Sequence, residues 1–367
     1  MNIAITAEHA NIDQLTGVEH YTRELIHALA RVDDRNQYTL YLRTPPGTWC
    51  SNLPSNFKIR VVAARMAWTQ LHVSWEIFKS MPDALLVTSF SMPFIHPRNS
   101  VVTIHDLAWR LFPETVELKD RVWLLLTHRF AAASAKRLIA VSQQTRHDLM
   151  ELMKVKSQKI EVIHHGFALV PADAGTPSPL MPTTSSRKNS AVGIDGPFVL
   201  CLGTLQPRKN LVRMIDAFLA LKQRTGLPHT LVLAGRAGWM CNDVLEKVRV
   251  SPDVLHLGYV PDRLSLLRAA DLLVQPAVYE GFGLSLLDAF SQGVPVACSN
   301  VSSLPEIAGD AAELFDPYST ESISAAMIHV LTNPERAEEL RRLGNRRLQS
   351  FNWDDCAKRT LAVIEAT

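Results

Sequence analysis

The sequence is poor in cysteine, and its five cysteines follow no recognisable pattern. They stand at positions 50, 201, 241, 298 and 356, and no two of them have C-x-x-C spacing. An odd and scattered set argues against a disulfide framework and against a zinc site. It also suits a reducing compartment, where free thiols persist.

Long hydrophobic runs and a strong charge of either sign are also missing. No segment approaches the roughly 18–20 consecutive apolar residues of a membrane span, and the opening "MNIAITAEHA" has no charged region before an apolar stretch. The formal net charge is only +2, which is too small to indicate nucleic acid binding. We therefore expect a cytoplasmic protein with no signal peptide and no nucleic acid partner.

The chain has enough hydrophobic residues to form two cores, and its segments alternate between strand and helix patterns. At 367 residues, 47% of them hydrophobic, two domains of ordinary size are expected. Runs such as "NIAIT" and "SVVTIHD" alternate with helical patterns such as "GVEHYTRELIHALARV", and the alternation restarts at "PFVLCLGT". This alternation predicts an α/β protein of two Rossmann-like units, each with a parallel sheet covered on both faces.

The domain boundaries follow from where the alternation stops. Residues 168–196 are rich in Pro, Ser, Thr and Gly and predict a linker. One domain is therefore expected at 1–167 and a second at 197–350. The segment 351–367 contains a helix that follows another helix rather than a strand, so it could cross back to the first domain.

Two strand-to-helix turns of the second unit carry chemistry, at the edge where open α/β sheets bind ligands. In the first, "LGTLQPRKNL", Gly203 ends a strand, and Arg208 and Lys209 precede a helix that Asn210 could cap. A helix N-terminus beside two cations suits an anion, most naturally a diphosphate. The alternative is a solvated pair of basic residues.

The second turn is "YEGFGLSLLDAF". Gly281 and Gly283 allow a ligand to approach the backbone, and the helix expected directly after them offers free amides. Glu280 and Asp288 are acceptors that suit neighbouring hydroxyls of a sugar or a ribose. The turn therefore predicts a nucleotide-sugar site. The alternative, that acids merely complement the helix dipole, explains Asp288 well and Glu280 poorly.

The first half places histidines at strand ends. His105 and Asp106 follow "SVVTI" at the ligand-binding edge, although a histidine hydrogen-bonded within a turn is the alternative. His164 and His165 are adjacent on a strand and point to opposite faces, so they cannot both bind one metal.

These segments resemble the retaining glycosyltransferases of family 4, which have the GT-B fold. "YEGFGLSLLDA" followed by "GVPV" is similar to that family's E-x7-E region, and "GTLQPRKNL" to its Arg/Lys phosphate turn. "GVEHYTRELIHAL" resembles its first glycine-containing turn, and "TIHDLAW" and "VSQQTRHDL" resemble segments of its acceptor domain. The resemblance covers nearly the whole chain and implies two Rossmann-like domains facing each other across a cleft. Within the family, the chain is most similar to bacterial enzymes that build O-antigen or exopolysaccharide, many of them mannosyltransferases.

The resemblance also implies roles for individual residues. The expected catalytic residues are Glu280, Arg208, Lys209 and His105. The expected substrate-binding residues are Gly17, Gly203, Gly281, Phe282, Gly283, Leu284, Ser285 and Asp288. His105 would approach the donor sugar or its phosphate. For Tyr279 and Phe282, packing is a more common role than stacking on a base.

Two positions depart from the family pattern. The second acid of E-x7-E is Asp288, which is one methylene shorter than glutamate, so weaker or altered nucleotide binding is expected. Glu19 stands where relatives often have glycine. Because a carboxylate would repel a diphosphate, Glu19 should point away from it or toward acceptor hydroxyls.

The resemblance implies an enzyme that moves a hexose, with mannose favoured, from GDP-mannose or another nucleoside diphosphate sugar to a hydroxyl of a glycan or lipid-linked glycan. We expect neither a cofactor nor a metal, because the cations would replace a metal and the first domain has no D-x-D-like motif. A sugar-nucleotide epimerase on the same scaffold and a catalytically silent nucleotide-sugar binder are the alternatives. A dinucleotide-dependent oxidoreductase is disfavoured, since no G-x-G-x-x-G follows the first strand of either unit.

Peripheral contact with the cytoplasmic face of the inner membrane is a further hypothesis. The basic, Trp-bearing helix expected at 119–137 could lie on an anionic surface. The alternative, packing of "VWLLL" into the domain core, is the more common outcome for such a helix.

Overall fold

The chain folds into two compact α/β units. The structure is a computed structural model that describes residues 1–12, 17–64, 66–167 and 194–366. The first unit comprises Met1–Ala168 and Phe351–Thr367, and the second comprises Leu169–Ser350. Most of the expected linker, residues 168–193, lies outside the described residues.

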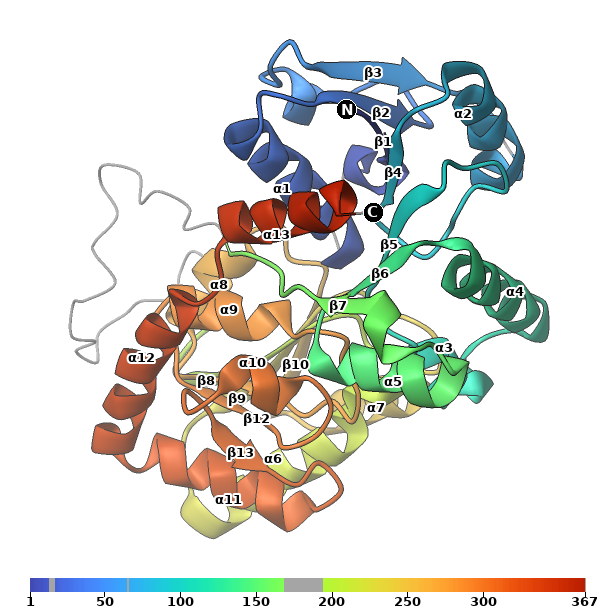
Figure 1. Cartoon of the computed structure of the whole chain (residues 1–367). Helices are drawn as coiled ribbons and strands as arrows, with labels where there is room; N and C mark the ends of the chain where they lie inside the picture. Colours follow the sequence, from blue (N-terminus) through green and yellow to red (C-terminus); the bar gives the residue numbers. More distant parts are fainter. Residues whose placement is uncertain (13–16, 65, 168–193, 367) are drawn as a thin grey trace. The chain divides into compact units, whose positions relative to one another are not determined.

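The first unit is built on a seven-stranded parallel sheet in the order β3-β2-β1-β4-β5-β6-β7 (Figure 1). All four residues of β4 are buried, as expected for a central strand of a sheet covered on both faces. The strands are β1 (Asn2–Thr6), β2 (Gln37–Leu42), β3 (Phe57–Val61), β4 (Ala84–Val87), β5 (Asn99–Ile104), β6 (Arg137–Ala140) and β7 (Ile160–Val162).

Helices connect these strands, with short single-turn helices between them. The α-helices are α1 (Gly17–Val32), α2 (Ser74–Ser80), the single turn α3 (Ala108–Leu111), α4 (Leu118–Ser134), α5 (Gln143–Met153) and α13 (Trp353–Glu365). The short ones are η1 (Glu8–Asn11), η2 (Thr48–Cys50), the π-helix η3 (Trp68–Val73), η4 (Pro113–Thr115) and η5 (Ser157–Lys159).

Helix α13, from the C-terminal end of the chain, packs against α1 of the first unit (Figure 1). Its buried face, which includes Trp353 and Leu361, joins the same core as Leu25 of α1. Gly166 permits the close approach of this helix, because a Cβ there would lie 2.2 Å from the Trp353 backbone nitrogen. Packing of an apolar helix face, rather than the two exposed ion pairs Arg31–Asp354 and Arg359–Glu161, accounts for this placement.

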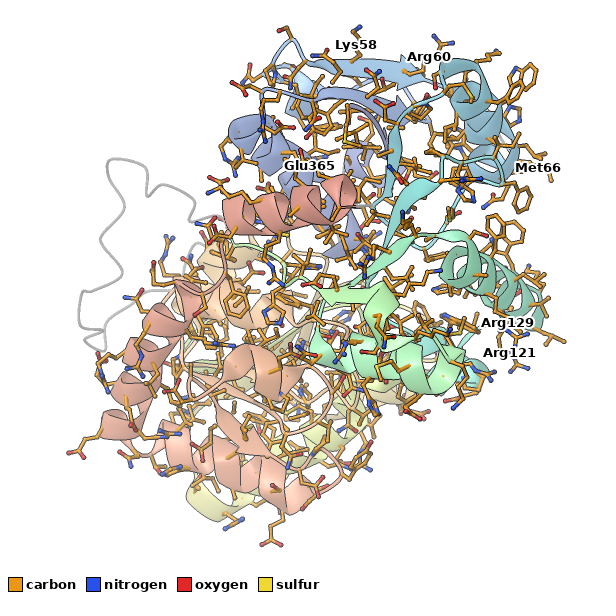
Figure 2. The ribbon with its side chains drawn as sticks, in the orientation of Figure 1. Lys58, Arg60, Met66, Arg121, Arg129 and Glu365 are labelled. Carbon is orange, nitrogen blue, oxygen red and sulfur yellow. The ribbon has the colours of Figure 1, made fainter. Side chains whose placement is uncertain are left out.

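Helix α4 divides its apolar residues between the core and the solvent. Leu124 and Leu125 pack against the core, whereas Val122, Trp123 and Leu126 are exposed. Arg121 and Arg129 project from the same helix (Figure 2). The expected packing of "VWLLL" into the core therefore holds for only part of that segment. No helix among the described residues is long and apolar enough to cross a membrane.

The second unit has a six-stranded sheet in the order β10-β9-β8-β11-β12-β13. Its strands are β8 (Phe198–Leu202), β9 (Thr230–Ala234), β10 (Val254–Gly258), β11 (Leu272–Gln275), β12 (Val296–Ser299) and β13 (Glu313–Phe315). Its helices are the single turn η6 (Pro207–Lys209), α6 (Leu211–Thr225), α7 (Asn242–Val250), α8 (Arg263–Ala269), α9 (Leu284–Ser291), α10 (Leu304–Ala308), α11 (Thr320–Leu331) and α12 (Pro334–Leu348).

The strand order of this sheet brings two turns together. Strand β8 pairs in parallel with both β9 and β11. Successive strands are added on one side of β8 as far as β10, and on its other side from β11 onward, so the strand order reverses between β8 and β11. In open α/β sheets, ligands bind outside the carboxyl ends of the strands at such a reversal. The turn after β8 and the loop after β11 both lie at this point, and they are the two motifs singled out in the sequence.

The expectation for Asn210 was wrong. Asn210 stands before α6 with a left-handed backbone (φ 57°), and its side chain makes no cap to the helix. Its amide instead donates to the carbonyls of Pro276, at 3.1 Å, and Pro317, at 2.7 Å. Bonds to two distant loops satisfy this side chain in place of the local helix cap.

Candidate active site

An ion pair between Arg208 and Glu280 joins the two turns. Arg208 lies in η6, and its Nη1 donates to Glu280 Oε2 at 2.8 Å and to the Tyr279 carbonyl at 3.0 Å. A backbone bond of 2.9 Å from Val278 N to Arg208 O fastens the same two segments. The acid at 280 and the cation at 208 are therefore parts of one rigid arrangement.

Lys209 binds the other carboxylate oxygen of Glu280. Its Nζ donates to Oε1, which also accepts a bond of 3.2 Å from Gln275 Nε2. The lysine side chain passes over Gly203, where a Cβ would lie 3.1 Å from Nζ. Gly203 also has a φ of +130°, a conformation that favours glycine. This position therefore accommodates both the turn and the lysine.

These three charges are largely shielded from solvent. The side chains of Arg208, Lys209 and Glu280 are 19%, 11% and 10% exposed. Burial opposes the charge on Glu280, but the adjacent Arg208 and Lys209 outweigh it and lower the pKa of Glu280 to about 2. Burial lowers the pKa of Lys209, and the Glu280 carboxylate opposes that shift. With both cations and the carboxylate ionised, the cluster has a formal charge of +1.

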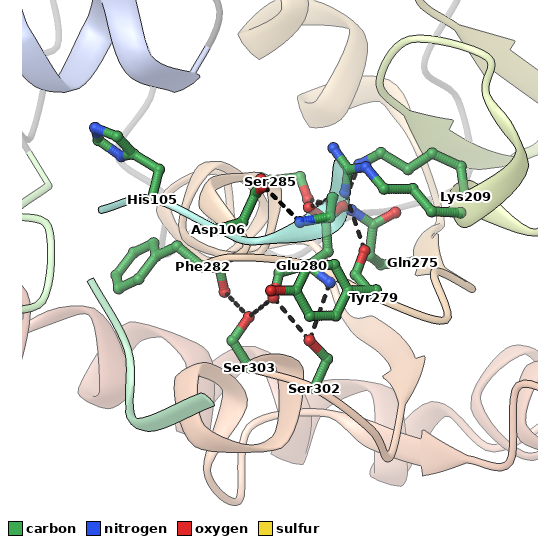
Figure 3. Close-up of polar contacts among 12 residues, drawn as sticks. His105, Asp106, Lys209, Gln275, Tyr279, Glu280, Phe282, Ser285, Ser302 and Ser303 are labelled. Atoms are coloured by element: carbon green, nitrogen blue, oxygen red, sulfur yellow. Dashed lines mark hydrogen bonds and ion pairs between the residues drawn. The ribbon is translucent and has the colours of Figure 1, made fainter. Parts of the chain in front are cut away.

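Two serines fix the backbone of Glu280. Ser302 Oγ accepts from Glu280 N at 3.0 Å and donates to Glu280 O at 2.7 Å. Ser303 Oγ lies 2.9 Å from the Glu280 carbonyl oxygen and 2.8 Å from that of Phe282, so its hydroxyl can donate to either (Figure 3). Hydrogen bonds from the segment after β12 therefore fix the backbone of the loop before α9.

The N-terminus of α9 faces the same region. Gly283 precedes the helix with a φ of +112°, and the first helical residues are Leu284 and Ser285. The first amides of a helix have no carbonyl in a preceding turn, and they attract anions. Gln275 Nε2 donates to Ser285 Oγ at 3.0 Å, so one amide side chain links Glu280 to the start of this helix.

Asp288 is held separately, by Arg263 of α8. Arg263 Nε donates to Asp288 Oδ2 at 2.8 Å, and Nη2 lies 3.4 Å from Oδ1. Asp288 is buried, whereas the arginine side chain is 44% exposed. The second acid therefore already has a cationic partner, which the sequence pattern did not predict.

The aromatic residues and Gly281 of the loop are buried. Tyr279 and Phe282 both belong to the buried apolar set, in agreement with the packing role expected for them. Tyr279 contributes its backbone carbonyl to Arg208, and Phe282 contributes its carbonyl to Ser303.

His105 belongs to the first unit and is half-buried just after the carboxyl end of β5. Its Nε2 lies 2.9 Å from the Thr88 carbonyl oxygen, so this nitrogen is the donor. Its ring meets that of Tyr21 edge to face, with the centroids 4.8 Å apart. Burial lowers the pKa of His105, which favours the neutral imidazole.

The remaining positions of the first unit that the sequence singled out are Gly17, Glu19, His164 and His165. Gly17 is the first residue of α1 and is exposed. Glu19 Oε1 lies 3.9 Å from His9 Nδ1. His165 is buried against the Tyr21 ring, and His164 contacts Phe351. Within the described parts of the chain, no group of three or more His, Cys, Asp or Glu residues could hold a metal ion.

Comparisons with known proteins identify the family. "Glycosyltransferase Family 4" matches residues 15–169, and "Glycosyl transferases group 1" matches residues 183–347. The O-antigen chain mannosyltransferase B of Escherichia coli is 32% identical over 271 residues, which cover 71% of this chain and 69% of that protein. The chain belongs to the family 4 glycosyltransferases.

Solved structures establish the GT-B fold of this glycosyltransferase. WaaG, a glycosyltransferase involved in lipopolysaccharide biosynthesis, has a TM-score of 0.74 at 16% identity, covering 99% of each chain. Anabaena Alr3699/HepE in complex with UDP-glucose has a TM-score of 0.73 at 17% identity, covering 100% of each chain. At these identities the likeness shows the fold alone.

The sequence motifs of this glycosyltransferase did not reveal the residues that support its charged cluster. Gln275, Ser302 and Ser303 contact the Glu280 loop from β11 and from the segment after β12, and Arg263 holds Asp288 from α8. Each is separated along the chain from the motif that it supports. Only Gln275, the last residue of a buried strand at the ligand-binding edge, carried a signal in the sequence: a polar residue within an apolar run.

Proposed function

We propose that this glycosyltransferase transfers a hexosyl unit, with mannose favoured, from a nucleoside diphosphate sugar such as GDP-mannose to a hydroxyl of a glycan or lipid-linked glycan in surface polysaccharide synthesis. The carrying observation is the buried cluster of Arg208, Lys209 and Glu280 beside the N-terminus of α9. The similarity to a protein named O-antigen chain mannosyltransferase B supports the sugar and the class of product.

The cations and the helix amides act on the leaving group. As the bond between the anomeric carbon and the diphosphate oxygen breaks, negative charge grows on the diphosphate and the sugar ring gains oxocarbenium character. Arg208, Lys209 and the amides of Leu284 and Ser285 are preorganised donors for that charge. Lys209 donates to Glu280 through one N–H, and an ammonium has three. These donors serve in place of a metal.

Retention follows from a reaction on one face of the sugar. The acceptor oxygen forms its bond to the anomeric carbon on the side that the diphosphate leaves, and the departing phosphate oxygen takes the acceptor proton. This step needs no nucleophile from the protein. Glu280 stays ionised because of its two cations, so it can accept sugar hydroxyls and stabilise the positive ring carbon.

The binding residues divide among the diphosphate, the ribose and the sugar of the donor. Gly203, Gly281 and Gly283 allow the backbone to approach the diphosphate. Asp288 accepts from the ribose hydroxyls, directly or through a water. In the first unit, Gly17 and His105 serve the donor phosphate or sugar, with His105 neutral.

A donor screen tests the proposal. Thermal shift with GDP-, UDP- and ADP-sugars identifies the nucleotide, because a ligand that binds the native state raises its apparent stability. Incubation of the preferred donor with a mannan-type acceptor, with and without chelator, then gives a product whose linkage is assigned by NMR. An α-linked product from an α-linked donor, formed equally in chelator, is the expected result. An inverted linkage contradicts the retaining mechanism, and loss of transfer in chelator contradicts metal independence.

The same assays separate the alternatives. A sugar-nucleotide epimerase converts the donor to its epimer with no acceptor present. A silent binder gives a thermal shift and neither transfer nor hydrolysis; the replacement of glutamate by Asp288 is the observation that favours it. Transfer to the acceptor, with the donor otherwise unchanged, excludes both.

We further place the enzyme in the cytoplasm, in peripheral contact with the inner membrane through α4. Val122, Trp123 and Leu126 expose apolar surface, and Arg121 and Arg129 on the same helix complement anionic lipid. Vesicle flotation with Leu126→Ser and Trp123→Ser variants tests this contact. Binding to anionic vesicles that the substitutions abolish is expected, and unchanged flotation of the variants contradicts it.

A further inference from the structure

We propose that the first unit carries a second phosphate-binding site, in a hollow formed by the C-terminal part of α4, the start of β6, the end of α5 and η5. The hollow has a volume of about 610 Å³. Six cationic residues line it: Arg129, Lys136, Arg137, Lys154, Lys156 and Lys159. The ligand would be a phosphate group, either free or carried on a lipid headgroup.

The charge of this hollow is one-sided. No carboxylate is among its lining residues, all of which belong to the described part of the chain. Surfaces usually intersperse charges of both signs, because like charges brought together repel one another. Six cations on elements and on the connections between them are therefore an arrangement that a polyanionic ligand would stabilise.

Two of the six cations already have structural partners. Lys159 Nζ donates to the carbonyls of Ala132, at 2.6 Å, and Ala133, at 2.9 Å, and so completes the C-terminal end of α4. Arg137 donates to the Gln158 carbonyl. Bonds to backbone carbonyls explain these two residues without any ligand.

The other cations are not explained in this way. Lys154 lies 4.0 Å from Glu151, a loose contact between exposed side chains. Within the described residues, the side chains of Arg129, Lys136 and Lys156 form no ion pair, and all three residues are exposed. Flexible exposed ammonium and guanidinium groups around a hollow can converge on phosphate oxygens, with which they form charge-assisted hydrogen bonds.

The position of the hollow separates it from the ligand-binding edge of its own sheet. Arg137 is the first residue of β6, and Lys159 directly precedes β7, so the hollow lies at the amino ends of these strands. His105 follows the carboxyl end of β5, at the opposite edge. The hollow is therefore separate from His105, a first-unit residue of the proposed donor site.

Met153 provides a local probe, because it lines the hollow. In the full-length protein labelled with ¹³C-methyl methionine, the Met153 signal, assigned by Met153→Leu, is followed during titration with inorganic phosphate. We expect a saturable shift in the wild type. In the double variant Lys136→Gln/Lys156→Gln, the dissociation constant for inorganic phosphate should rise at least about tenfold. The matched control, Lys58→Gln/Lys358→Gln, removes two exposed lysines outside the hollow and should behave as wild type.

Flotation with phosphatidylcholine vesicles, with and without phosphatidic acid, identifies the source of the phosphate. Binding that requires both phosphatidic acid and the two lysines assigns a lipid headgroup. A Met153 shift with phosphate but no lysine-dependent flotation assigns a free phosphate or a soluble ester. If neither probe binds, or if the double variant responds to both probes as the wild type does, the site does not exist.

Discussion

Arg208 and Glu280, 72 residues apart in the chain, are joined by a 2.8 Å ion pair. The pair lies in the second unit, where the strand order of the sheet reverses between β8 and β11. Lys209 binds the other oxygen of the same carboxylate. One acid therefore neutralises only one of two adjacent cations. The remaining positive charge, held beside free helix amides, suits a ligand more negative than a single carboxylate.

Removal of either cation should abolish most of the turnover. Arg208→Ala or Lys209→Ala should lower kcat/KM at least about 100-fold, because each removes a preorganised donor to the leaving diphosphate. Arg224→Ala, which removes an exposed cation near the end of α6, is the matched control and should leave kcat/KM unchanged. Circular dichroism confirms folding, and wild-type turnover in either cluster variant would remove the proposed role.

Glu280 should make stability depend on pH in the acid range. Its folded pKa of about 2 lies below its usual value of 4.5, so the unfolded state binds more protons between these values. The contribution of Glu280 is therefore complete above about pH 5, and it is lost as the pH falls toward 2.

Glu280→Gln isolates this effect. Unfolding by urea, measured from pH 7 down to pH 3, should show the wild type more stable at pH 7 by a few kcal/mol, and this difference should shrink with decreasing pH. The glutamine preserves the shape and leaves the cations without their acid. A constant difference across that range would show that the ionised Glu280 does not contribute in this way.

The sequence predicted the elements of this fold better than the contacts between them. Runs of buried apolar residues indicated β8 and β11, and the adjacent motifs placed Arg208, Lys209 and Glu280 after those strands. The sheet order then brought the two motifs together, as expected for an α/β unit. Local pattern and global topology agree here, which is why the place of both motifs at the ligand-binding edge could be predicted, whereas the ion pairs between them were not.

The supporting contacts could not be predicted because they depend on tertiary packing. Asn210 has the residue type and position of a helix cap, yet two carbonyls from distant loops bind its side chain. Arg263 reaches Asp288 only because α8 packs beside α9. For His105, the strand pattern gave its place at the end of β5, whereas its bond to Thr88 depends on the neighbouring β4.

Asp288 should affect donor binding more than the chemical step. Asp288→Asn removes the charge that would accept from the ribose, and we expect the donor KM to rise about tenfold with kcat nearly unchanged. Arg263→Gln tests the alternative that the acid only pairs with arginine. If Asp288 has only that structural role, both variants should lose similar stability, about 1 kcal/mol or less for this partly exposed pair, with the KM unaltered.

Gly203→Ala should damage both the turn and the position of Lys209. The backbone φ of +130° is strained for alanine, at a cost of roughly 1–3 kcal/mol, and the new methyl would lie 3.1 Å from Lys209 Nζ. Gly226→Ala is the control, because Gly226 also has a positive φ, +67°, but has no atom within 4 Å of the added Cβ. Both variants should unfold at lower temperature, whereas only Gly203→Ala should lose turnover, measured well below both unfolding temperatures. Equal turnover in the two variants would mean that Lys209 does not need its present position, and that its ion pair with Glu280 can re-form around a side chain at 203.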